Sequence, residues 1–200
     1  RKSLALRPLF DFRLGDLQVG GIEGLVFPAS HGDRFAWTGW SDASEKGNVL
    51  VLFTMASLEK VIVPDFAAAQ YMLGNLQWSL DGETIYAAVA TPVGEEDSIQ
   101  ISVGAIPVAG GPARLFPIVV LEGDRSENDE GDEGDYFMPF YQIALSPDGT
   151  TIAVELANLD FDGNNADKRG LYLLDIQSPK PTVRKIPIPP SAAGLKEDAQ

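Results

Sequence analysis

The chain has 200 residues, of which 44% are apolar and 22% are charged, so it carries enough apolar material for a packed core. Its formal net charge of −14 repels phosphate groups and argues against binding to nucleic acid or to an anionic membrane surface. The chain has no cysteine and one histidine, which excludes a disulfide framework and a thiol nucleophile and argues against a His-rich metal site or a Ser-His-Asp triad.

The chain divides into a lead-in segment, three repeated units, one acidic insertion and a tail. In chain order, the predicted segments are a lead-in strand or the end of a preceding unit at 1–23, unit one at 24–73, unit two at 74–121, an acidic loop at 122–137, unit three at 138–187, and a tail or the start of a further unit at 188–200.

Each unit opens with the same short pattern. Residues 76–87 and 143–154 align without a gap and share apolar-x-apolar-Ser-x-Asp-Gly-x-x-Ile-x-apolar, and residues 26–37 are a weaker copy. The alternating apolar residues predict strands, and Asp-Gly predicts a tight turn because Gly accepts a positive φ without a Cβ clash. The pattern therefore predicts three β-hairpins, with turns at Gly32, Gly82 and Gly149.

Two further apolar strands follow each hairpin, so each unit is predicted to contain four short antiparallel strands. In chain order these strands are 49–53 and 60–63, then 99–103 and 113–116, then 171–176 and 182–186. Residues 57–60 and 65–71 each allow one turn of helix, and no segment has a sustained helical period. The 20 glycines and 14 prolines also favour many turns, and the sequence predicts an all-β fold.

The third unit carries a resemblance to a known family. Ser-Pro-Asp-Gly-Thr-Thr-Ile-Ala at 146–153, followed by Gly-Leu-Tyr-Leu-Leu-Asp-Ile at 170–176, resembles the WD40-like (PD40) repeat of TolB-type β-propellers. The second unit is similar, with Leu80 where the family prefers Pro, and the first departs further, with Ala-Ser-His-Gly at 29–32. The resemblance implies propeller blades of four antiparallel strands, three of them within this chain. Because propellers close with about four to eight blades, it also implies part of a larger propeller, or an oligomer that completes the ring.

The acidic insertion is the most conspicuous candidate for a binding surface. Its carboxylates outnumber its single cation, Arg125; they are Glu122, Asp124, Glu127, Asp129, Glu130, Asp132, Glu133 and Asp135. A mobile loop is one interpretation, and a site for a cation or a basic partner is the other. Strands in a blade alternate in direction, so the insertion is expected to share one face with the loops at 41–46, 92–98 and 158–169.

A second acidic segment suggests a calcium site. The oxygen-bearing side chains of Asp160, Asp162, Asn164 and Asp167 lie close together around Gly163, as a hard cation requires of a tight loop. The segment does not match an EF-hand, because Gly163 is at the fourth position of the loop and not at the sixth, and no Glu is at the twelfth. An elongated hairpin loop is the alternative explanation of the same residues.

The other singled-out residues favour structural roles. His31 lies at a predicted turn, and Trp37, Trp40 and Trp78 are typical of core packing, with stacking on a sugar or peptide as the alternative. We find no catalytic constellation and no cofactor-binding motif in the sequence.

The leading hypothesis is a non-enzymatic recognition module, in which an acidic propeller segment of a periplasmic or secreted protein binds a protein or peptide, basic in character, through its acidic loop face. The alternative is the substrate-gating propeller portion of a prolyl-oligopeptidase-like or tricorn-like peptidase, with the catalytic domain outside this chain.

Overall fold

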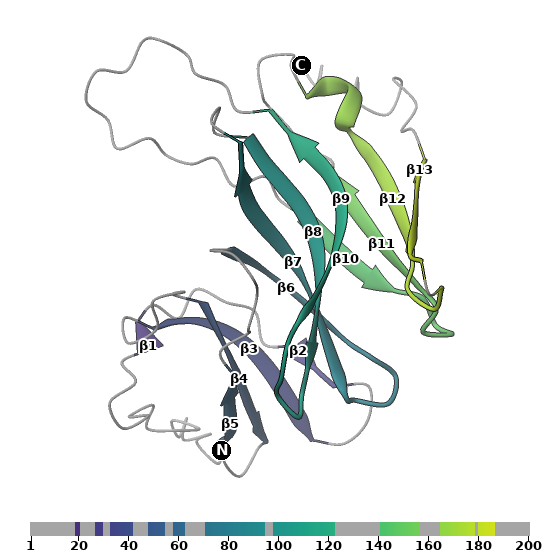
Figure 1. Cartoon of the computed structure of the whole chain (residues 1–200). Coiled ribbons are helices and arrows are strands. Elements are labelled where there is room, and N and C mark those ends of the chain that lie inside the picture. The colour runs from purple at the N-terminus through teal and green to yellow at the C-terminus, as the bar shows by residue number, and fades with distance from the viewer. Residues whose placement is uncertain are drawn as a thin grey trace, which may run out of the picture.

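A computed structural model of the chain describes residues 19–20, 27–29, 33–41, 48–54, 58–62, 71–94, 98–122, 141–156, 165–178 and 180–186 (Figure 1). Within these ranges the chain is all-β and every strand pairing is antiparallel. The one helical segment of these ranges is the 3₁₀ turn η1 (Ala166–Lys168). No described helix is long and apolar enough to span a membrane.

The strands form three sheets that follow one another along the chain. Sheet 1 has the order β1-β3-β4-β5, with β2 also paired to β3; its strands are β1 (Val19–Gly20), β2 (Phe27–Pro28), β3 (Arg34–Ser41), β4 (Asn48–Thr54) and β5 (Leu58–Ile62). Sheet 2 contains β6 (Tyr71–Trp78), β7 (Thr84–Val93), β8 (Ser98–Pro107) and β9 (Arg114–Leu121). Sheet 3 contains β10 (Tyr141–Leu145), β11 (Thr151–Leu156), β12 (Gly170–Asp175) and β13 (Thr182–Ile186).

Sheets 2 and 3 are four-stranded meanders, because their spatial strand order equals their order in the sequence. This confirms the antiparallel four-strand units predicted for these two regions. The single helical turn allowed at residues 57–60 is wrong, because β5 begins at Leu58 and pairs with β4. The backbone of this segment makes its hydrogen bonds with β4 and not within a helical turn. None of the sheets closes on itself within the described ranges.

The predicted turns have the same hydrogen bonds in both meanders. In sheet 3 the hydroxyl of Ser146 donates to Asp148 Oδ1 (2.6 Å), and Asp148 Oδ1 also accepts the N–H of Thr150 (3.1 Å). Gly149 follows with φ +72°, a conformation that a side chain would strain. In sheet 2, Ser79, Asp81 and Gly82 repeat this arrangement. The shared sequence pattern is therefore a shared hydrogen-bonded turn, whereas Gly32 lies outside the described residues.

These turn carboxylates make the fold sensitive to acid. The hydroxyl of Ser146 and the N–H of Thr150 stabilise the charged form of Asp148 and lower its pKa, and Ser79 with the N–H of Glu83 does the same for Asp81. Because the folded pKa is lower than the unfolded one, this stabilisation is present above the unfolded pKa of about 4 and is lost as the pH falls through the folded pKa.

We expect Asp148→Asn to be less stable than the wild type at pH 7 and to lose that deficit on acidification, since Asn keeps an oxygen acceptor but carries no charge. Urea unfolding at pH 7 and at about pH 3 measures the difference. A stability gap of equal size at both pH values would contradict this account.

Two cores lie between the three sheets. One core lies between sheets 1 and 2, and its fully buried members include Leu50, Leu76 and Ile85. The other lies between sheets 2 and 3 and includes Ile101 and Ile152. Sheet 2 is therefore covered on both faces, which explains why β7 is a nearly continuous apolar run rather than an alternating strand.

Candidate functional site

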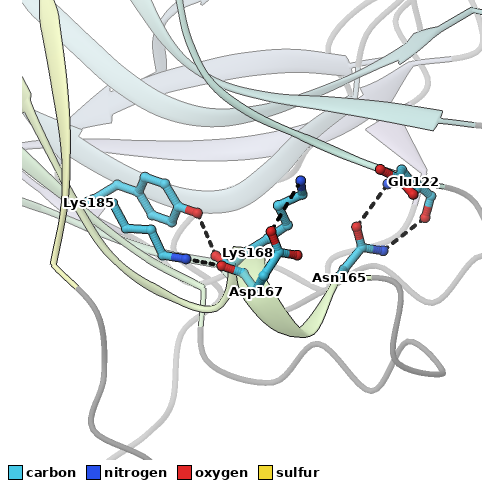
Figure 2. Close-up of polar contacts among 6 residues, drawn as sticks. Glu122, Asn165, Asp167, Lys168 and Lys185 are labelled. Carbon is cyan, nitrogen blue, oxygen red and sulfur yellow. Dashed lines mark hydrogen bonds and ion pairs between the residues drawn. The ribbon is translucent and has the colours of Figure 1, made fainter.

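The end of β9 in sheet 2 lies beside the segment that leads into β12 of sheet 3. Asn165 connects them: its Oδ1 accepts the N–H of Glu122 (3.0 Å), and its Nδ2 donates to the carbonyl oxygen of Glu122 (2.9 Å) (Figure 2). The Asn165 residue is fully buried, at 0% exposure. One amide side chain thus satisfies both backbone groups of Glu122, as a neighbouring strand would. We call this pair the amide clamp.

The 3₁₀ turn beside the amide clamp is fixed by two side chains from sheet 3. The hydroxyl of Tyr172 donates to the carbonyl oxygen of Lys168 (2.5 Å), and Lys185 Nζ donates to the carbonyl oxygen of Asp167 (Figure 2). Lys185 Nζ also lies 5.7 Å from the centre of the Tyr172 ring. Carbonyl groups at the end of a helical turn lack internal partners, so both contacts stabilise the turn.

Gly170 makes room for this arrangement. A Cβ atom there would lie 2.9 Å from Lys185 Cε and 3.0 Å from the carbonyl oxygen of Ile186, and the residue has φ +153°. The glycine that opens the third strand of the repeat pattern therefore has a physical role: it lets Lys185 cross above it to reach the 3₁₀ turn.

Tyr172 is held in its protonated form. Burial of the phenol raises its pKa, and the nearby charge of Asp167 raises it further. The hydroxyl therefore remains a hydrogen-bond donor to Lys168 well into the alkaline range. The site at neutral pH presents the carboxylates of Glu122 and Asp167 outward and uses its neutral and cationic groups internally.

The four residues of the predicted calcium site fall mostly outside the described part of the chain. Asp160, Asp162 and Asn164 lie outside it. Asp167 lies within it, in η1, with 74% of its side chain exposed and a carboxylate oxygen 3.5 Å from Lys168 Nζ. The described residues contain no group of three or more acidic or histidine side chains arranged to hold a metal ion.

Of the other residues singled out in the sequence, some lie within the described part of the chain and some lie outside it. Glu122 is exposed at the end of β9, while residues 123–140 and His31 lie outside the described ranges. Trp78 is buried in the core between sheets 1 and 2, where the guanidinium of Arg34 lies 5.4 Å from its ring centre. Trp37 is buried in a separate cluster with Val49, Val51 and Phe53 of sheet 1. Core packing is therefore the role of these two tryptophans; Trp40 lies in β3.

Sequence analysis missed the residues that build the site, namely Asn165, Tyr172 and Lys185. Tyr172 gave one usable signal, because a tyrosine on the buried face of a strand needs a partner for its hydroxyl. Asn165 gave none, because its partner lies 43 residues away. No family model and no curated protein sequence matches this chain.

Proposed function

We propose that this chain is a three-blade segment of a β-propeller and that it binds a basic protein or peptide through an acidic face at the amide-clamp end. The stacking of the sheets supports the propeller. Successive sheets pack face to face. The first strand of sheet 2, β6, contacts the first strand of sheet 3, β10, and also contacts β2 and β3 of sheet 1. Blades arranged around a common axis bring their inner strands together in this way.

The amide clamp is the observation that supports the acidic face. It holds Glu122, the first residue of the acidic insertion, against Asn165, at the end of the loop that joins β11 to β12. The acidic insertion therefore begins at the same point of the fold at which a second acid-rich segment, far away in the sequence, ends. Asp167, two residues further on, adds a carboxylate that is 74% exposed and lies 3.5 Å from Lys168 Nζ.

The charge of the chain favours a cationic partner. The net charge is −14, and the carboxylates of the insertion outnumber its one arginine. A surface of one sign concentrates partners of the opposite sign and accelerates their association, with a strong dependence on salt. Recognition by this face is therefore expected to be electrostatic and to be carried by the exposed carboxylates.

Binding of oligolysine, measured by calorimetry at low ionic strength, tests the proposal. Glu122→Gln/Asp167→Asn removes two charges from the acidic face, and Glu83→Gln/Asp33→Asn removes two exposed charges elsewhere as the matched control. At about 0.2–1 kcal/mol per exposed ion pair, the first variant should weaken binding roughly 2- to 30-fold, and the control should change it much less.

Replacement of residues 123–134 by a short Gly-Ser linker should weaken binding further and shift the free energy of unfolding by less than about 1 kcal/mol. Equal weakening by the two double variants would mean that only the net charge matters and would contradict a specific face. Absence of oligolysine binding at low salt would contradict the proposal as a whole.

A further inference from the structure

The outer strand of sheet 3 has a definite backbone orientation. The N–H of Ile176 donates to the carbonyl oxygen of Thr150 (3.0 Å), so the adjacent pair Thr151 and Asp175 is a non-hydrogen-bonded pair of the antiparallel ladder. Hydrogen-bonded and non-hydrogen-bonded pairs alternate along an antiparallel ladder. A residue whose backbone groups bond to the strand on one side therefore does not bond to the strand on the other side. The backbone N–H and C=O of Asp175 therefore point toward β13, where Asp175 is paired with Thr182.

The same alternation fixes which groups of β13 point outward. Arg184, like Thr182, directs its N–H and C=O toward β12, whereas Val183 and Lys185 direct theirs away from the sheet. All five residues of β13 have exposed side chains, with Val183 and Ile186 each at 38% exposure. Within the described part of the chain no strand pairs with the outer side of β13, which is thus an open edge of sheet 3.

The open edge of β13 is short on hydrogen-bond donors. Pro181 precedes the strand at the next outward-facing position, and Pro187 follows it in the sequence. Neither residue has an N–H, so Val183 and Lys185 are the only outward donors between them. The strand also carries two adjacent cations, Arg184 and Lys185. Prolines and charges at edges are devices that discourage pairing with another strand.

The outer strand of sheet 2 has an equivalent device. The N–H of Val108 donates to the carbonyl oxygen of Glu83 (2.9 Å), and counting along the ladder from this pair directs the backbone groups of Ser102 toward β7. Ser102 and Pro117 are therefore a non-hydrogen-bonded pair between β8 and β9. The missing N–H of Pro117 therefore faces outward from β9, and its side chain is exposed.

A β-bulge adds to the protection of β9. The register shifts between Ile101 and Ser102, directly opposite Pro117. The side-chain amide of Gln100 holds this irregularity, since its Nε2 donates to the carbonyl oxygens of Ile101 (2.7 Å) and Val119 (2.9 Å). Bulges bend an edge away from the flat geometry that a second strand needs.

We propose that the outer edges of sheets 2 and 3 are closed to β-pairing with a second copy of this chain, through the outward-facing prolines 117 and 181. The inference is independent of the proposed function, because it rests on the backbone ladder alone. It assigns the outer strands to a non-associating rim and leaves the strand ends and their loops for contact with partners.

Amide hydrogen exchange of the wild-type protein tests the geometry. The amides of Val183 and Lys185 should exchange on the order of tenfold faster than the amide of Arg184 at every protein concentration. Slow exchange at Val183 and Lys185, or protection that increases with concentration, would show that β13 is paired with another strand and would overturn the proposal.

The variant Pro117→Thr/Pro181→Thr restores both outward N–H groups, and Pro147→Thr changes an exposed proline in a turn as the matched control. We expect the double variant to show a molar mass in light scattering that increases with concentration, while the wild type and the control keep one constant mass. A folded double variant with the wild-type mass at all concentrations would refute the role of the prolines. If that variant fails to fold, the exchange measurement on the wild type still decides.

Discussion

Ile152→Ala is expected to lower the free energy of unfolding by about 2–5 kcal/mol, the range measured for large-to-small substitutions in closely packed cores. Ile152 is fully buried in the core between sheets 2 and 3. Its removal leaves a cavity that both sheets line, and a packed interior relaxes only partly around such a cavity. Urea unfolding, followed by the fluorescence of the buried Trp78, measures the loss.

Leu173→Ala is the matched control, because it removes the same number of carbon atoms from the paired strand. Leu173 lies on the opposite face of sheet 3 and is only partly buried. Its replacement should cost clearly less than the replacement of Ile152. A larger cost at Leu173 would mean that the second face of sheet 3, rather than the one against sheet 2, provides the main packing.

Gly170→Ala is expected to destabilise the fold by about 1–3 kcal/mol, the cost of holding a residue in a backbone conformation that side chains rarely adopt. The new Cβ would also press on the carbonyl oxygen of Ile186, which cannot move without disturbing β13, and on Lys185 Cε, which can. We expect the loss of stability to be accompanied by loss of the Lys185 contact with the 3₁₀ turn. Urea unfolding measures the first effect.

Gly94→Ala separates the two causes. Gly94 also has a positive φ, +74°, but a Cβ there would meet nothing within 4 Å. It should therefore show the cost of a left-handed backbone without any overlap, which is a lower bound for the backbone cost at Gly170, where φ is +153°. If the two alanine variants lose the same stability, the crossing of Lys185 over Gly170 contributes nothing measurable.

Local features of the fold were predictable from the sequence. The turns at Gly82 and Gly149 follow from the demand of a tight turn for glycine. The strand β11 follows from apolar residues that recur with a period of two. The start of β5 at Leu58 was not predictable, because residues 57–60 contain one apolar residue, and a single residue defines neither a strand period nor a helical period.

The candidate site was only partly predictable, and the reason is sequence distance. Its acidic character is visible in the composition of the insertion, so the sequence indicates Glu122. The partner of Glu122 is not visible, because an asparagine that bonds to a backbone 43 residues away looks the same in sequence as any asparagine in a loop. The sequence shows where the prolines are. It does not show which of them face outward from an edge strand, because that depends on which alternate residues of the strand bond to the neighbouring strand.

The amide clamp has a consequence for engineering. Because Asn165 fixes the chain at Glu122, and β10 fixes it again from Tyr141, the segment between them is closed by the scaffold at both ends. The entropy of closing a loop grows slowly with length, at about 0.6 kcal/mol per doubling. The position therefore suits grafting: a foreign epitope or a sensor peptide inserted there would be displayed from a rigid base, and the host would tolerate a wide choice of lengths.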